Sequence, residues 1–265
     1  MKKYLFFLGF SFTVSGLIQA QYLKVPIGKK FKVVTQTENN IEATMMDQHQ
    51  EIRNESIVFH DLELKAITNT GYTLSITPTR FKMQMNMVGM EQKIDTDSAS
   101  TLSAPEMAAF NELLNQPIII VMDSNKLVSK TVVKQVPAIT ANLDDPNRFF
   151  LLMEPSKMVQ GYQWVDSIGN ADMRSVNHYT VMNVSPTEVE LNITTDSKIS
   201  TVTKMQEMEI KQTLKGYATA KRWYNRINGL ILKEESTTDM AGTTETPETN
   251  SPVSLKIKLK LVVEQ

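Results

Sequence analysis

Strict alternation of apolar and polar residues limits the folds that this sequence can adopt. Phe and Met alternate with Lys, Gln and Asn from Phe81 to Met87, and aliphatic residues alternate with three lysines from Leu255 to Leu261. Successive side chains of a β-strand point to opposite faces of the sheet, so this period is typical of half-buried strands. Antiparallel sheets commonly have one buried and one solvated face. The sequence therefore predicts a mainly β protein.

Ten further segments combine strand-forming residues with flanking turn residues. They are Phe31–Thr37, Ile57–Ile67, Tyr72–Thr77, Ile118–Met122, Leu127–Val133, Asn177–Val184, Thr187–Thr194, Ser197–Met205, Met208–Leu214 and Leu230–Glu234. Sequential strands joined by short turns form meanders. We expect one or more curved antiparallel sheets, or a half-barrel, made from two meander halves with one or two short helices.

The predicted helix follows the pattern Ser103-Ala104-Pro105-Glu106, which resembles a capping box with proline in the first turn. Met107–Asn115 continues with good helix formers, and Pro117 ends the segment. A weaker helical or irregular segment is expected over Val136–Leu152, where two prolines interrupt the pattern.

The domain organisation follows from this order of elements. We expect residues 21–265 to form a single mainly β domain, with two possible similar halves at about 21–100 and 160–265. The helix and a hairpin, at about 103–133, would join these halves. The segment Glu235–Pro252 is rich in Thr, Glu and Pro, so we predict a mobile loop over residues 235–252.

Residues 1–20 have the pattern of a secretory signal peptide. Lys2 and Lys3 precede an apolar run from Tyr4 to Ile18, and Ala20 provides a small residue before a cleavage site at Gln21. The run is too short for a comfortable membrane span, so no transmembrane segment is expected after leader cleavage. The protein is therefore expected to be exported, to the periplasm or the extracellular space.

Composition narrows the function classes. The chain has no cysteine, which argues against thiol catalysis and thiolate metal sites. Removal of Lys2 and Lys3 with the leader leaves 26 basic and 29 acidic residues, and no basic patch stands out. Nucleic acid is therefore not expected as a partner. The hydrophobic fraction of 41% favours a packed core.

The sequence offers little catalytic chemistry. Its three histidines show no metal-binding spacing, and His60 shares the apolar face of its strand with Val58 and Leu62. A single histidine there is more often a core residue than a ligand or base. The acid pair Asp95 and Asp97 is typical of turns. We predict no catalytic residues, no metal site, no cofactor and no enzymatic activity.

Methionine is the one compositional excess, with 16 residues. Phe81, Met83, Met85 and Met87 share one face of a predicted strand, and a Met-lined concave face suits apolar ligands such as acyl chains. These four residues form the predicted ligand-lining set. Two alternatives stay open: the methionines pack the core beneath the helix, or their thioethers bind Cu(I).

Four short motifs mark turns and strand starts: Gly28-x-x-Phe31, Asn115-Gln116-Pro117-Ile118, Gly161-x-x-Trp164 and Asn228-Gly229-Leu230. Together they resemble those of a domain-of-unknown-function family of exported β proteins common in Bacteroidota. The family has no established activity, so the resemblance implies export and a β fold without assigning site residues. By architecture alone, the chain is more distantly similar to the half-barrel of periplasmic lipoprotein carriers.

These observations lead to two hypotheses of function. The first is a non-enzymatic binding or envelope-associated protein, which binds an apolar ligand or an envelope partner on a concave sheet face. The alternative is a structural or adhesion-type surface protein without a small-molecule ligand.

Overall fold

The computed structural model describes residues 23–45, 48–87, 90–98, 108–123, 126–131, 148–169, 173–205, 208–247 and 249–264. These residues form mainly antiparallel sheet with little helix, which confirms the predicted fold class. The 12-stranded sheet has the order β6-β5-β3-β2-β1-β12-β11-β10-β9-β8-β7, with β4 paired to β3 off this path. The sheet is open, because β6 and β7 end the path within the described residues.

The strands vary in length from short hairpin strands to long, bent ones. Their bounds are β1 Lys30–Met45, β2 Gln48–Ile67, β3 Gly71–Met87, β4 Met90–Asp95, β5 Ile118–Asp123, β6 Lys126–Thr131, β7 Gln163–Gly169, β8 Met173–Val184, β9 Glu188–Met205, β10 Met208–Asn225, β11 Ile231–Glu245 and β12 Asn250–Glu264. The helix α2 covers Ala108–Leu113, and a short 3-10 helix, η3, covers Pro155–Lys157.

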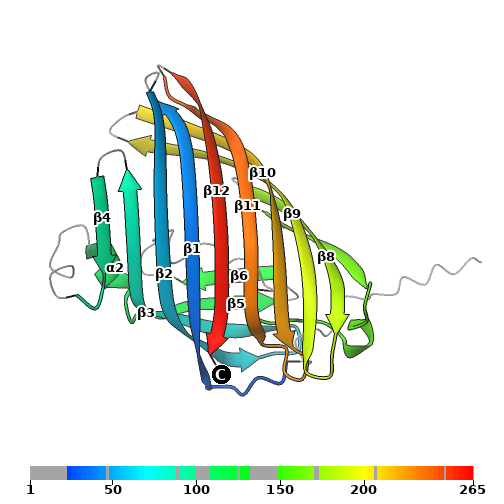
Figure 1. Cartoon of the computed structure of the whole chain (residues 1–265). Helices are drawn as coiled ribbons and strands as arrows, with labels where there is room; N and C mark the ends of the chain where they lie inside the picture. The colour runs from blue at the N-terminus through cyan, green and yellow to red at the C-terminus, as the bar shows by residue number, and fades with distance from the viewer. Residues whose placement is uncertain are drawn as a thin grey trace, which may run out of the picture.

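Two meanders lie side by side in this sheet. Strands β1 to β4 pair consecutively, and so do strands β7 to β12. β1 also pairs with β12, from Lys32 opposite Glu264 to Ala43 opposite Val253, which joins the meanders into one sheet (Figure 1). Whether the two halves arose by duplication stays a prediction.

The helix and the hairpin lie between the meanders in sequence, where they were expected. α2 buries Leu113 completely, and Asn115 follows it with a φ of 61°. A left-handed residue just after a helix ends the helix, and the Asn115 N–H donates to the carbonyl of Pro78 at 2.7 Å. β5 and β6 then form the hairpin, with β5 paired to β3. Residues 99–107 and 132–147 lie outside the described residues.

The large sheet has two chemically different faces. The inner face carries Val58, Leu261 and Leu191 and is turned toward β5 and β6, around which the sheet bends (Figure 1). The outer face carries most of the charged side chains, such as Lys258 and Glu38. On β12, Leu259, Leu261 and Val263 are buried while the intervening lysine is exposed, as alternation predicted.

The main core fills the base of the inner face. An irregular segment, Arg148–Met153, is buried throughout and covers the apolar ends of the strands. Its backbone bonds to the β10–β11 turn, since Leu151 N–H donates to Gly229 at 2.8 Å and Ile231 N–H donates to Phe149 at 2.9 Å. The base of the bent sheet is therefore closed by the protein itself.

The prediction of a mobile loop over residues 235–252 is wrong. β11 continues to Glu245 and β12 begins at Asn250, and the two strands pair as far as Glu245 opposite Asn250. Threonine is β-branched and favours strands, and only alternate positions need to be apolar on a half-solvated strand. Composition alone indicated disorder because it ignores this alternation.

Two segments that were predicted as separate strands form a single strand. β9 runs continuously from Glu188 to Met205 and so joins the predicted strands Thr187–Thr194 and Ser197–Met205. Asp196 lies on the outer face and is exposed, so its polarity does not interrupt the strand.

Gly242 of β11 is required by the close approach of β10. A Cβ atom added there would overlap the Thr213 carbonyl oxygen and lie 2.8 Å from the Thr213 carbonyl carbon. We expect Gly242→Ala to lower the free energy of unfolding by about 1–3 kcal/mol, through overpacking against backbone. Urea denaturation measures this change, and Ala241→Ser at the exposed neighbouring position is the control. Equal stability of the two variants would contradict the close approach.

Candidate functional site

The inner face continues beyond the core as a partly buried surface. Aligned positions across the strands form a polar belt, defined here as Asn54, Asn39, Thr238, Thr195 and Asn177. The apolar residues Ile257 and Ala218 occupy the positions on either side of Thr238. Within it, Asn39 donates to the Asn54 side-chain oxygen at 2.6 Å, and Thr195 donates to the Asn177 side-chain oxygen at 2.8 Å. The belt separates the main core from a second apolar area.

That second area is the rim cluster, near the far ends of the central strands. It comprises the buried residues Leu214, Met240 and Val253 and the partly buried residues Ile41, Ala43, Ile199 and Leu255. The inner face thus has an apolar base, a polar belt and an apolar rim. Such an arrangement offers contacts to a molecule that is mainly apolar.

The four residues of the predicted ligand-lining set lie on the inner face of β3. Phe81 is completely buried and therefore belongs to the closed packing of the protein. Met83 and Met85 are partly buried, opposite Ser56 and Asn54 of β2. The side chain of Met87 lies outside the described residues. The accessible part of the predicted set is therefore Met83 and Met85, whose ligand-binding role stays a prediction.

A buried ionic network lies between the base and the polar belt, and sequence reasoning missed it. Glu234 of β11 and Arg222 of β10 are cross-strand neighbours, and the Arg222 Nε donates to Glu234 Oε2 at 3.0 Å. The Arg148 Nε lies 3.7 Å from the same oxygen. All three side chains are nearly inaccessible to solvent. One carboxylate therefore ties the covering segment to two strands of the sheet.

Glu234→Gln tests the strength of this network. The substitution removes the buried negative charge that both guanidinium groups face, so we expect a loss of about 3–5 kcal/mol in the free energy of unfolding. The matched control is Glu235→Gln, since Glu235 is exposed on the outer face of the same strand. Urea denaturation of the two variants measures the difference, and an equal effect would show that the buried carboxylate is not structurally important.

His60 is buried beside this network, as the sequence predicted for a core histidine. It is 6% exposed, and its Nε2 lies 3.4 Å from the Thr35 hydroxyl. Its Nδ1 has no hydrogen-bond partner among the residues that the structure describes. Burial, assisted by the positive charge of Arg148, lowers the pKa of His60 from 6.5 to about 3. The imidazole is therefore neutral at neutral pH and unsuited to proton transfer there.

The lowered pKa of His60 predicts loss of stability in acid. The unfolded chain binds a proton at His60 below pH 6.5, whereas the folded chain does so only near pH 3. Stability should fall across this window by about 1.4 kcal/mol per pH unit. His60→Leu should flatten the slope, while His178→Gln, at an exposed position, should not. Urea denaturation at about pH 7 and pH 5 measures it, and parallel slopes for all three proteins would contradict the assignment.

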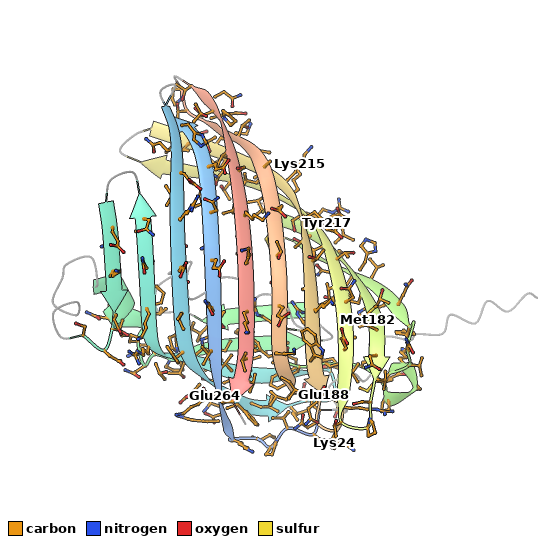
Figure 2. The ribbon with its side chains drawn as sticks, viewed as in Figure 1. Lys24, Met182, Glu188, Lys215, Tyr217 and Glu264 are labelled. Carbon is orange, nitrogen blue, oxygen red and sulfur yellow. The ribbon has the colours of Figure 1, made fainter. Side chains whose placement is uncertain are left out.

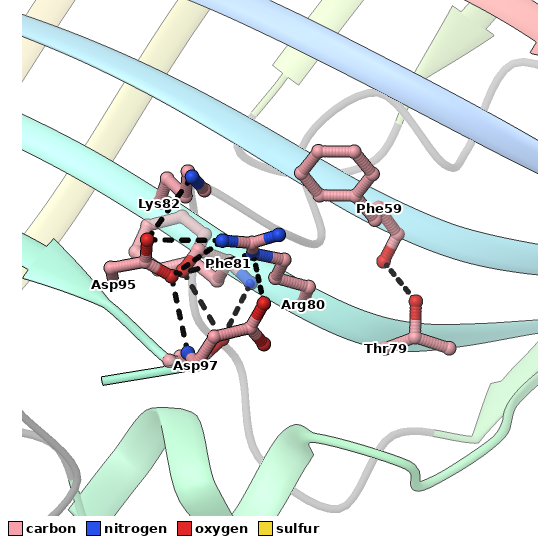
Figure 3. A network of polar contacts seen from close by, with 8 residues as sticks. Phe59, Thr79, Arg80, Phe81, Lys82, Asp95 and Asp97 are labelled. Carbon is pink, nitrogen blue, oxygen red and sulfur yellow. Dashed lines mark hydrogen bonds and ion pairs between the residues drawn. The ribbon is translucent and has the colours of Figure 1, made fainter. Parts of the chain in front are cut away.

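The acid pair Asp95 and Asp97 supports the β3–β4 hairpin (Figure 3). Arg80 lies 3.1 Å from Asp95 Oδ2 and 2.8 Å from Asp97 Oδ2, and Lys82 also lies 3.1 Å from Asp95. Hydrogen bonds from Arg80 lower the pKa of Asp95 to about 2, assisted by the Asp97 backbone N–H and Lys82. A carboxylate held ionised in this way does not act as a general acid near neutral pH.

The outer face is densely polar (Figure 2) and bears a shallow depression of about 460 Å³. Its lining includes Lys221, Lys258, Lys260, Glu38 and Glu235, with Lys258 and Glu38 paired at 3.2 Å. This depression suits solvent or polar partners. The outer face also exposes single apolar side chains such as Met182 and Tyr217, whereas the clustered apolar areas lie on the inner face.

Among the described residues, no group of three or more His, Cys, Asp or Glu side chains is placed to hold a metal ion. The described part of the chain also contains no helix long and apolar enough to span a membrane.

Comparison with known proteins identifies a related fold. The chain matches no protein-family model and no curated protein sequence. A structure concerning lipid–protein interactions in lipovitellin matches with a TM-score of 0.56 and 11% identity, over 91% of this chain and 25% of that chain. The chain thus spans a quarter of lipovitellin, and the identity is low enough that the likeness shows the fold alone.

Two bacterial proteins align over most of this chain with much lower scores. OccK8 (OprE) of Pseudomonas aeruginosa has a TM-score of 0.22 and 8% identity, over 90% of this chain and 99% of that chain. An outer membrane channel from Pseudomonas putida F1 has a TM-score of 0.23 and 8% identity, over 92% of this chain and 98% of that chain. These scores are too low to support a shared fold. The resemblance to the exported Bacteroidota family stays a prediction.

Proposed function

We propose that this protein binds a lipid-like apolar ligand on its inner face, without catalysing a reaction. The observation that carries the proposal is the partial exposure of apolar side chains beyond the closed core, among them Met83, Met85, Ile257 and Leu255. Apolar surface that meets water costs about 25 cal/mol per Å², so these partly exposed apolar side chains favour an apolar partner.

Two further observations support the same assignment. The polar belt and the apolar areas beside it offer both hydrogen bonds and apolar contacts on one surface. The related fold of lipovitellin comes from a structure concerned with lipid–protein interactions. Export to the periplasm or cell surface is part of the proposal, because the leader-like residues 1–20 would bring the protein to a compartment bounded by lipid. Methionine side chains adapt readily to chains of different shape.

Native mass spectrometry of protein purified from an exporting host tests the proposal. The wild type should carry an adduct of lipid-like mass. Met85→Lys places a charge on the inner face and should weaken the adduct while changing the free energy of unfolding by less than about 1 kcal/mol, because a partly exposed position tolerates a long charged side chain. The control is Gln84→Lys, on the outer face of the same strand, which should retain the adduct.

Other outcomes separate the remaining hypotheses. A loss of several kcal/mol in Met85→Lys, without any adduct in the wild type, would assign the methionines to the core and favour a structural or adhesion-type protein. Binding of Cu(I) that depends on Met83 and Met85 would favour the copper alternative. Either outcome would contradict lipid binding on this face.

A further inference from the structure

β12 carries an uninterrupted apolar row across the inner face. Its inward side chains are Val253, Leu255, Ile257, Leu259 and Leu261, which connect the rim cluster to the main core. The row passes through the polar belt at Ile257. Among the described strands that contribute to the rim cluster, β1, β9 and β11 bear polar side chains on this face between the rim and the main core. β10 bears only the small residues Gly216, Ala218 and Ala220 there, so β12 is the strand of this group that carries large apolar side chains along the whole distance.

The polar neighbours of this row limit its width. Ile257 lies between Asn39 of β1 and Thr238 of β11, and the next position, Leu259, lies between Thr37 and Ser236. We call the apolar row of β12 the lane. Neighbouring strands are about 4.8 Å apart, so the lane is about one side chain wide at the belt. A fused-ring molecule or a pair of chains lying there would also cover polar groups, whose desolvation is unfavourable.

The length of the row matches an acyl chain. Val253 and Leu259 are six residues apart, which corresponds to about 20 Å along a strand. One leaflet of a bilayer holds its acyl chains in roughly 15 Å, half of its hydrocarbon thickness. A single extended chain of common lipid length can therefore contact the whole row from the rim to the edge of the core.

We infer, building on the proposed lipid binding, that the ligand is a single-chain acyl amphiphile that lies along β12. Ile257 is the central contact, because it is the apolar residue at which the chain crosses the polar belt between Asn39 and Thr238. The lane selects against sterol-like ligands by its width. Met83 and Met85 lie on β3, which β2 and β1 separate from β12, so they border the inner face and are not the main support of the bound chain.

Photo-crosslinking of the full chain tests this placement. The probe is hexadecanoic acid bearing a diazirine near its methyl end, with peptic peptides mapped by mass spectrometry. The label should fall on peptides of β12 and its neighbours β1 and β11. Excess unlabelled hexadecanoic acid should compete, whereas cholesterol should not. Labelling confined to β3 and β4, or competition by cholesterol, would overturn the single-chain lane while leaving lipid binding intact.

A matched pair of variants tests the role of Ile257. Ile257→Asn completes the polar belt and should weaken binding of hexadecanoic acid by about tenfold, as expected for loss of one central apolar contact. Lys258→Asn, on the outer face of the same strand, should bind as the wild type does. Equal binding by both variants would overturn the lane. The wild-type labelling pattern still tests the lane if Ile257→Asn fails to fold, and no labelling anywhere would overturn the proposed lipid binding itself.

Discussion

The pairing of β1 with β12 is the contact on which the rest of the structure depends. It joins strands from opposite ends of the described chain, as the ion pair between Glu38 and Lys258 illustrates across 220 residues. Without this ladder each meander would expose a long edge, and neither would enclose the base of the inner face. Its register also fixes which side of β12 is buried. A slip of one residue would turn the lysines inward and the aliphatic residues outward.

Long-range pairing has a cost in folding. Closing a loop of this length is entropically unfavourable, and topologies rich in such contacts fold slowly. The buried segment Arg148–Met153 supplies compensating local and distant contacts at the base. It binds the β10–β11 turn through its backbone, and Phe150 packs edge-on against Tyr72 of β3 at 5.3 Å between ring centres. Contacts from both meanders therefore meet on one short segment.

The inner face combines a buried ionic network with a partly exposed surface of polar and apolar side chains. Near the base, Arg148, Arg222 and Glu234 are held in a buried ionic network, whose charges are stabilised by mutual contact rather than by water. Farther along the same strands, small hydroxyl and amide side chains are only partly buried. The inner face therefore changes from a closed base, which holds the buried ionic network, to an open surface of polar and apolar side chains. The outer face is mostly polar, with single exposed apolar side chains such as Met182 and Tyr217.

Alternation in the sequence determined the fold class, the inward residues of β12 and the core position of His60. Local turn chemistry also placed the helix and the hairpin. These features depend on neighbours a few residues away, which is why the sequence reveals them. Composition misled in one place, because the threonine-rich residues 235–252 are mostly strand. These residues include few large apolar side chains, so the alternation between the two faces is hard to recognise in the sequence.

Only the tertiary structure decided which residues of different strands meet. Register places Glu234 beside Arg222 and Ile257 between Asn39 and Thr238, and no short-range pattern encodes those neighbours. The methionine-rich strand shows the same limit. Its alternation placed Phe81 and Met85 on one face, but burial depends on what covers that face, so Phe81 is closed off while Met85 stays partly exposed. The sequence of a strand determines its two faces, whereas the packing of distant strands determines what each face contacts.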